Sequence, residues 1–137
     1  MQHFPDAKAV IRALSPDEPV ILNRPHAAVR AARFFVEKFP GKSLYAVKAN
    51  PSPDLIRVLW DSGVTHYDVA SITEVRLVRG LLPDATLCFM HPIKAPGAIR
   101  EAYFDHGVRT LDGLPWKCGW QELRRSSKKT VDSTNST

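Results

Sequence analysis

The chain has 137 residues, of which 44% are hydrophobic and 24% are charged. This composition is typical of a soluble globular protein with enough residues for one ordinary domain. No uninterrupted apolar run approaches the roughly 18 residues that a membrane span needs. The first six residues lack the basic and then apolar pattern of a signal peptide. We therefore expect no membrane association and a cytoplasmic location.

The formal net charge is +5, and a positive charge can indicate nucleic-acid binding. Much of the basic excess comes from four residues of a polar tail, Arg124, Arg125, Lys128 and Lys129. We therefore expect no nucleic-acid partner. Cys88 and Cys118 lack the spacing of a metal site and are too few for a disulfide framework. The sequence thus predicts free thiols and no bound metal.

The N-terminal part predicts two helices separated by an extended segment. Asp6 can cap a short helix that ends near Leu14. Residues 15–19 indicate a turn, and residues 20–22 (Val-Ile-Leu) are a short strand candidate. Pro25 can open the next helix at its first position, and that helix is expected to run to about Phe39.

From residue 43 onward, strand patterns and helix patterns alternate. The predicted strands cover residues 43–49, 66–69 and 86–90, and a fourth begins at 108–110. The predicted helices cover residues 53–63, 71–80 and 96–106. Strands that alternate with helices imply an α/β fold with parallel pairing through right-handed crossovers. Periodicity alone does not choose between an open doubly wound sheet and a (β/α)8 barrel, and a complete barrel needs about 250 residues.

The character of the sequence changes at Leu111. Residues 111–120 have no clean helix or strand period, and residues 126–137 are rich in Ser, Thr, Lys and Asn. Such a segment buries too little apolar surface to offset its ordering entropy, so we expect disorder there. The sequence thus predicts an N-terminal extension (1–18), an α/β region (19–110) and a divergent, disordered tail (111–137).

The segment Tyr45-Ala46-Val47-Lys48-Ala49-Asn50 carries the sharpest chemical signal. In a strand, Ala46, Lys48 and Asn50 would share one face. A lysine near the carboxyl end of a parallel strand reaches the edge of the sheet where ligands bind. Burial there would lower its pKa and favour the neutral amine, the nucleophile that forms an imine with an aldehyde cofactor. A lysine that extends its charge to solvent at a strand end explains the same pattern, and spacing alone favours that alternative.

Three motifs resemble those of the fold-type III pyridoxal-phosphate enzymes, a family that includes alanine racemase and the ornithine, diaminopimelate and arginine decarboxylases. Residues 45–50 are similar to the lysine motif of the family. Residues 67–74 (Tyr-Asp-Val-Ala-Ser-Ile-Thr-Glu) resemble the second-strand motif of the decarboxylases, and residues 91–94 (His-Pro-Ile-Lys) resemble a segment after the third strand in the ornithine decarboxylase branch. His91 and Lys94 belong either to the substrate site or to a solvated loop. The resemblance covers roughly residues 19–110.

The resemblance implies a partial (β/α)8 TIM-type barrel, alanine racemase-like, of about three and a half β/α units, with pyridoxal 5'-phosphate at the mouth formed by the carboxyl ends of the strands. It implies that Lys48 is the catalytic lysine that binds the cofactor, with Ala46 beside the ring. It also implies that Asp68 holds the lysine nitrogen by a charge-assisted hydrogen bond, although Asp68 could be an ordinary strand-end residue. Glu74 has two interpretations, because Ser71 to Glu74 has the spacing of a capping box, whereas the family places this glutamate near the cofactor.

The function implied by the resemblance is that of a carboxy-lyase for a basic amino acid. L-ornithine, converted to putrescine in polyamine biosynthesis, is the first expectation, and lysine, arginine and diaminopimelate stay open. Complete members are homodimers whose phosphate loop, ring-stacking histidine and ring-nitrogen glutamate lie beyond the fourth strand, without counterparts in this sequence. We therefore expect a truncated, frame-shifted or split-gene product that is inactive alone. The alternative is a non-catalytic fragment that binds the cofactor or a partner.

Overall fold

The computed structural model describes residues 3–112, so the predicted disorder of the tail lies outside the described residues. The elements of the described part, in chain order, are α1 (Ala7–Leu14), α2 (Pro25–Lys38), β1 (Leu44–Ala46), the 3-10 turn η1 (Val47–Ala49), α3 (Pro53–Asp61), β2 (His66–Val69), α4 (Ile72–Leu81), β3 (Thr86–Phe89), α5 (Pro96–Phe104) and β4 (Thr110–Leu111). The predicted alternation of strands and helices after residue 43 is confirmed.

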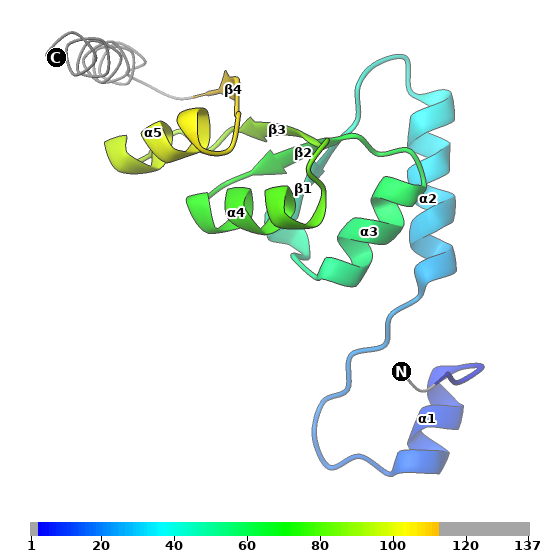
Figure 1. Cartoon of the computed structure of the whole chain (residues 1–137). Coiled ribbons are helices and arrows are strands. Elements are labelled where there is room, and N and C mark those ends of the chain that lie inside the picture. Colours follow the sequence, from blue (N-terminus) through cyan, green and yellow to red (C-terminus); the bar gives the residue numbers. More distant parts are fainter. Residues whose placement is uncertain (1–2, 113–137) are drawn as a thin grey trace, which may run out of the picture.

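The four strands form one parallel sheet in the order β1-β2-β3-β4. The connecting helices α3, α4 and α5 lie on one face of this sheet (Figure 1). A doubly wound sheet reverses its strand order and carries helices on both faces, whereas a barrel keeps consecutive strands adjacent with its helices outside. The arrangement is therefore that of part of a (β/α)8 barrel, which confirms the predicted fold class.

Local signals in the sequence set the helix ends. Asp6 caps α1 with its side chain, as predicted. Gly63, with a φ of +95°, follows α3 in the left-handed region that glycine adopts without strain. The Gly63 amide donates to the Trp60 carbonyl at 2.9 Å and the Val64 amide donates to the Leu59 carbonyl at 3.1 Å, which is a Schellman motif. None of the described helices is long and apolar enough to cross a membrane.

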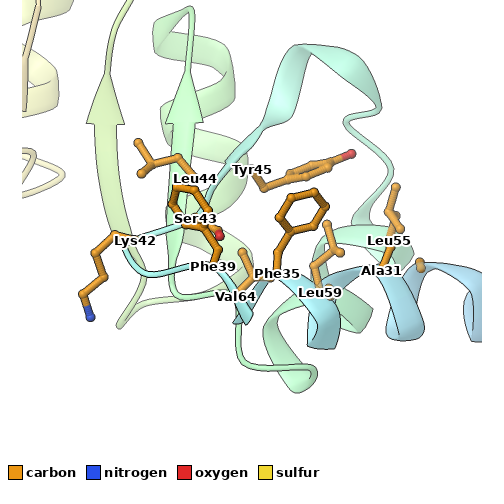
Figure 2. A pocket seen from close by; sticks show the side chains of 12 residues that line it. Ala31, Phe35, Phe39, Lys42, Ser43, Leu44, Tyr45, Leu55, Leu59 and Val64 are labelled. Carbon is orange, nitrogen blue, oxygen red and sulfur yellow. The ribbon is translucent and has the colours of Figure 1, made fainter. Parts of the chain in front are cut away.

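An apolar groove of about 590 Å³ lies between α2, α3 and the start of β1 (Figure 2). Phe35 and Phe39 of α2 and its C-cap reach into this groove, with Leu44 and Tyr45 of β1 on the other side. Phe35 remains 53% exposed. The groove therefore leaves apolar surface of α2 and β1 uncovered within residues 3–112.

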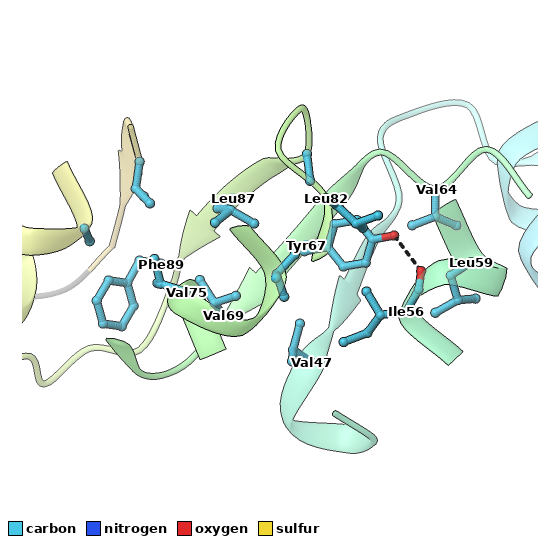
Figure 3. Packing of buried hydrophobic residues seen from close by; sticks show 14 of the residues in the cluster. Val47, Ile56, Leu59, Val64, Tyr67, Val69, Val75, Leu82, Leu87 and Phe89 are labelled. Carbon is cyan, nitrogen blue, oxygen red and sulfur yellow. Dashed lines mark hydrogen bonds between the residues drawn. The ribbon is translucent and has the colours of Figure 1, made fainter. Parts of the chain in front are cut away.

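The core lies between the three connecting helices and the sheet (Figure 3). Tyr67 and Val69 of β2 and Leu87 and Phe89 of β3 are buried against the helices. Because side chains alternate along a strand, the residues between them point to the opposite face of the sheet. The packing of the core thus fixes which residues of each strand face away from the helices.

The strand predicted at residues 20–22 is wrong. Residues 19–24 have no regular secondary structure and join α1 to the rest of the chain as an extended segment (Figure 1). Ile21 is 87% exposed there. An extended apolar segment becomes a strand only where a neighbouring strand supplies hydrogen bonds, and none of the described strands lies beside it.

Candidate active site at the carboxyl ends of the strands

Lys48 lies immediately beyond the carboxyl end of β1, on a turn. The strand predicted over residues 43–49 is shorter, because β1 ends at Ala46 and η1 begins at Val47. Val47 is fully buried, whereas Lys48 is exposed. The alternation that would place Ala46, Lys48 and Asn50 on one face therefore does not apply, and the described residues do not supply the burial expected of the Lys48 side chain.

A row of side chains crosses the sheet on the face that the helices leave uncovered. Ala46 pairs with Asp68, Asp68 with Cys88, and Cys88 with Thr110, and register partners in a parallel sheet point the same way. Burial raises the pKa of the Cys88 thiol, a hydrogen bond with Thr110 opposes this shift, and the charge of Asp68 adds to it. Ala46 and Asp68 thus lie on one face, close to Cys88 and Thr110.

The sequence did not single out Cys88 and Thr110 as neighbours of Asp68. Cys88 is a free thiol, as predicted, whereas Cys118 lies outside the described residues. Counting alternate residues from the start of each strand could have placed Cys88 on the same face as Asp68, but that count depends on the register between strands. Register is set by packing against the helices and is not readable from one strand alone.

Lys48 and Asp68 lie at the ends of neighbouring strands, since Ala46, two residues before Lys48, is the register partner of Asp68. Asp68 is half-buried. No hydrogen bond or ion pair joins Lys48 to Asp68 in the part of the chain that the structure describes. The structure therefore brings the two groups to the same edge of the sheet without a direct contact between them.

Glu74 takes part in the start of α4. The Ser71 side chain accepts a hydrogen bond from the Glu74 amide at 3.2 Å, and Glu74 Oε2 accepts one from the Ala70 amide at 2.7 Å. This reciprocal pair is a variant of the predicted capping box, in which the carboxylate reaches one residue further back than usual. The Glu74 carboxylate therefore lies at the carboxyl end of β2, where it binds the backbone two residues after Asp68.

The loop after β3 is held by Lys94. Lys94 Nζ donates to the carbonyl oxygens of His91 and Asp112 and lies 5.1 Å from the centroid of the buried Phe89 ring. Burial lowers the pKa of Lys94, and the charge of Asp112 opposes this shift. His91 is exposed, and its Nδ1 contacts the Ile93 carbonyl at 2.8 Å. Both side chains therefore bind backbone groups at the mouth: Lys94 ties the loop to the end of β4, whereas His91 makes a contact within the loop.

The side chains at this edge fit the aldehyde end of pyridoxal phosphate. An exposed primary amine (Lys48) can attack a carbonyl carbon, and a half-buried carboxylate (Asp68) can pair with a cationic nitrogen. Ala46, the register partner of Asp68, adds only a methyl group to this edge. Within residues 3–112 there is no glycine-rich loop that would bind the phosphate. The described side chains can thus hold one end of the cofactor.

The chain has a parallel sheet of barrel type, with amine and carboxylate side chains at the carboxyl ends of its strands. These features are typical of α/β barrel proteins, which bind their ligands at this mouth. Residues 26–113 match the family model described as "Pyridoxal-dependent decarboxylase, pyridoxal binding domain". The chain belongs to this family. This finding confirms two predictions, the resemblance inferred from the three motifs and the pyridoxal cofactor.

Two relatives place the chain more closely. It is 35% identical over 66 residues to a lysine/ornithine decarboxylase of Selenomonas ruminantium, and the match covers 47% of this chain and 16% of that protein. It also resembles the crystal structure of lysine/ornithine decarboxylase from Vibrio vulnificus complexed with putrescine, with a TM-score of 0.64, 26% identity, and coverage of 85% of this chain and 31% of that one. The chain therefore spans less than a third of the length of either relative.

Proposed function

We propose that this chain forms the cofactor-attaching part of a pyridoxal-phosphate-dependent decarboxylase of basic amino acids, and that Lys48 is the attachment point. The observation that carries this proposal is the position of Lys48, exposed on the turn that directly follows β1 and next to the strand that carries Asp68. The carboxyl ends of parallel strands are where barrels bind their ligands. Membership in the family supports the choice of cofactor.

Each side chain of the site has a proposed role. When bound, pyridoxal phosphate supplies an electrophilic carbonyl carbon and a ring that takes up the electron pair left by departing carbon dioxide. The Lys48 amine provides the nitrogen for attachment, and Asp68 accepts a hydrogen bond from a protonated nitrogen beside it. Ala46 leaves space for the ring. Glu74 fixes the start of α4 and so holds the backbone that follows Asp68.

L-ornithine is the proposed substrate, with putrescine as product in polyamine biosynthesis. This proposal is supported by the two relatives, which are lysine/ornithine decarboxylases, one of them solved with putrescine. Lysine is the first competitor. The described residues offer an amine, that of Lys48, which can bind the aldehyde of the cofactor, but they include no phosphate loop. Turnover would therefore require groups from further residues or from a second chain, as in the homodimers of the family.

Attachment at Lys48 is tested with the 137-residue chain itself. The chain is incubated with pyridoxal phosphate and reduced with borohydride, so that the lysine nitrogen gains a C–N bond to the former aldehyde carbon, the oxygen leaves as water, and hydride completes a secondary amine. Peptide mass spectrometry should then find the added mass on Lys48 and lose it in Lys48→Met. Lys42→Met, which removes an exposed lysine just before the amino end of β1, should leave the labelling of Lys48 unchanged. Equal labelling of Lys42 and Lys48 would contradict the proposal.

A second candidate function is cofactor or partner binding without catalysis. The observation that favours it is that residues 3–112 carry the amine and the carboxylate of the site but no glycine-rich phosphate loop. Release of labelled carbon dioxide from ornithine and from lysine, measured with and without a full-length lysine/ornithine decarboxylase, separates the two candidates. Attachment at Lys48 without turnover in either mixture would favour the non-catalytic role.

A further inference from the structure

Packing in the core anchors the turn that carries Lys48 at its first residue only. Val47, its first residue, is fully buried in the core, but Lys48, Ala49 and Asn50 are exposed. A three-residue 3-10 turn has few hydrogen bonds of its own. The position of Lys48 therefore depends on what holds the far end of the turn, at Asn50.

Tyr45 supplies that hold. Its hydroxyl donates to the Asn50 carbonyl at 3.0 Å, a hydrogen bond that spans η1 from the strand before it to the residue after it. On its other side, Asn50 accepts a hydrogen bond from the Ser52 amide through Oδ1 at 3.1 Å, just before α3 begins. Asn50 is thus bound both to β1 and to the start of α3.

The Tyr45 ring is itself held in place. It packs edge-on against the buried Tyr67 ring, with centroids 6.3 Å apart and an interplanar angle of 77°, and it lies beside Phe35 in the apolar groove (Figure 2). Burial raises the pKa of Tyr45, so its hydroxyl keeps the proton that it donates. A fixed ring with a protonated hydroxyl is suited to orient the backbone that it binds.

We propose that Tyr45 is the positioning residue for Lys48, and that its hydrogen bond to Asn50 holds the turn in the geometry that lets Lys48 attach pyridoxal phosphate. The inference rests on the proposed function for its chemical consequence. Its structural part, the fixing of the turn by the hydroxyl, stands on the contacts of Tyr45 and Asn50 alone.

Tyr67 provides a matched control within the same pair of rings. Its hydroxyl also donates to a backbone carbonyl, that of Ile56, at 3.3 Å (Figure 3). That bond joins β2 to α3 inside the core and does not touch the turn. Tyr45→Phe and Tyr67→Phe each remove one hydroxyl that binds a backbone carbonyl, but only the first removes it from the turn that carries Lys48.

The first measurement compares cofactor attachment in the 137-residue chain and its variants. The rate of borohydride-trapped attachment at Lys48, followed across pH, is expected to fall about three- to tenfold in Tyr45→Phe, as the loss of one hydrogen bond implies. In Tyr67→Phe the attachment rate should stay within about twofold of the parent rate, even if this variant loses as much thermal stability as Tyr45→Phe does. Asn50→Ala, which keeps Tyr45 and removes the Ser52 contact, is a second variant with an expected loss in the same direction. Equal rates in Tyr45→Phe and the parent, or equal losses in both phenylalanine variants, would overturn the inference.

The second measurement needs no cofactor. Amide hydrogen exchange over residues 47–50 should rise in Tyr45→Phe and not in Tyr67→Phe, where the increase should fall on β2 and α3. If the parent chain shows no attachment at Lys48, the proposed function fails, and exchange alone then decides whether Tyr45 fixes the turn. Unchanged exchange at residues 47–50 in Tyr45→Phe would reject the positioning role whatever the attachment rates.

Discussion

Ser71 and Glu74 close a pair of hydrogen bonds where β2 passes into α4. The Ser71 hydroxyl binds an amide that the helix cannot satisfy by itself, and replacing such a cap by alanine costs about 1 kcal/mol. We therefore expect Ser71→Ala to lower the free energy of unfolding by about that amount in urea titration. Thr73→Ala, at the exposed position directly before Glu74, should change the free energy of unfolding by less than about 0.5 kcal/mol. Similar losses in both variants would show that the cap is not formed.

Glu74→Gln separates the two interpretations of this glutamate. A glutamine keeps an oxygen that can accept the Ala70 amide, so the start of α4 should survive and unfolding should be little changed. If Glu74 only caps the helix, attachment of pyridoxal phosphate at Lys48 is also unchanged. We expect this result, because the Glu74 carboxylate accepts the Ala70 amide and the Glu74 amide donates to the Ser71 hydroxyl, so that both contacts belong to the cap. A fall in attachment at unchanged stability would instead assign Glu74 to the cofactor.

Local rules predicted some of these residues and missed others for a physical reason. The cap at Ser71 follows from spacing, and the position of Asp68 on the inner face of the barrel sheet follows from alternation; both involve only near neighbours in the sequence. The turn at Lys48 depends on the burial of Val47 and on a hydroxyl reaching from Tyr45 to Asn50. Such contacts exist only once α3 and β2 are in place, so the strand pattern over residues 43–49 overstated the length of β1.

At the scale of elements, α4 and α5 are joined by one bidentate ion pair. Arg76 Nε lies 2.5 Å from Glu101 Oε1, and the Arg76 guanidinium also donates to Oε2 at 2.7 Å. His106 Nε2 lies 3.3 Å from the same carboxylate. The hydrogen bond from Arg76 lowers the pKa of Glu101, the contact with His106 lowers it further, and desolvation opposes both.

This lowered pKa makes the contact between α4 and α5 dependent on pH. A carboxyl whose pKa is lower in the folded chain than in the unfolded chain stabilises the fold above its unfolded pKa, and this stabilisation is lost as the pH falls through the folded value. The difference in unfolding free energy between the parent and Glu101→Gln should therefore be present at neutral pH and disappear in acid. Urea titrations at several pH values measure it, with Glu37→Gln on α2 as control. Because the pair is partly exposed, the difference should be small and should shrink in high salt.

The helices were easier to predict than the strands because capping residues, prolines and glycines mark their ends within a few positions. Pro25, Pro53 and Pro96 each open a helix as expected. Strands depend on partners: the fourth begins at Thr110, and the apolar segment at residues 20–22 forms none. A strand pattern therefore predicts a structure only to the extent that the sheet contains a neighbour for it.

At the scale of the whole molecule, the order of the strands decided a question that periodicity left open. The sequential order β1-β2-β3-β4, with the connecting helices on one face, identifies a part of a barrel. The same order leaves β1 and β4 with one unpaired edge each among the described strands. Unpaired edges and uncovered apolar surface are the features through which chains associate. We therefore expect the 137-residue chain to be weakly stable and to self-associate, and a cooperative thermal transition of a purified monomer would contradict this.

The groove beside β1 offers a way to test which surface drives that association. Phe35 is half-exposed in the groove and Phe104 is similarly exposed on α5, so each can become polar without opening the core. Because the groove adds a continuous apolar surface next to the free edge of β1, Phe35→Gln should slow the growth of light scattering on warming and reduce binding of an apolar dye. Phe104→Gln, outside the groove, should reduce both much less. Because both side chains are about half exposed, neither change should alter the unfolding free energy by more than about 1 kcal/mol. Equal effects of the two variants would mean that association is a property of exposed aromatic residues in general and not of the groove beside β1.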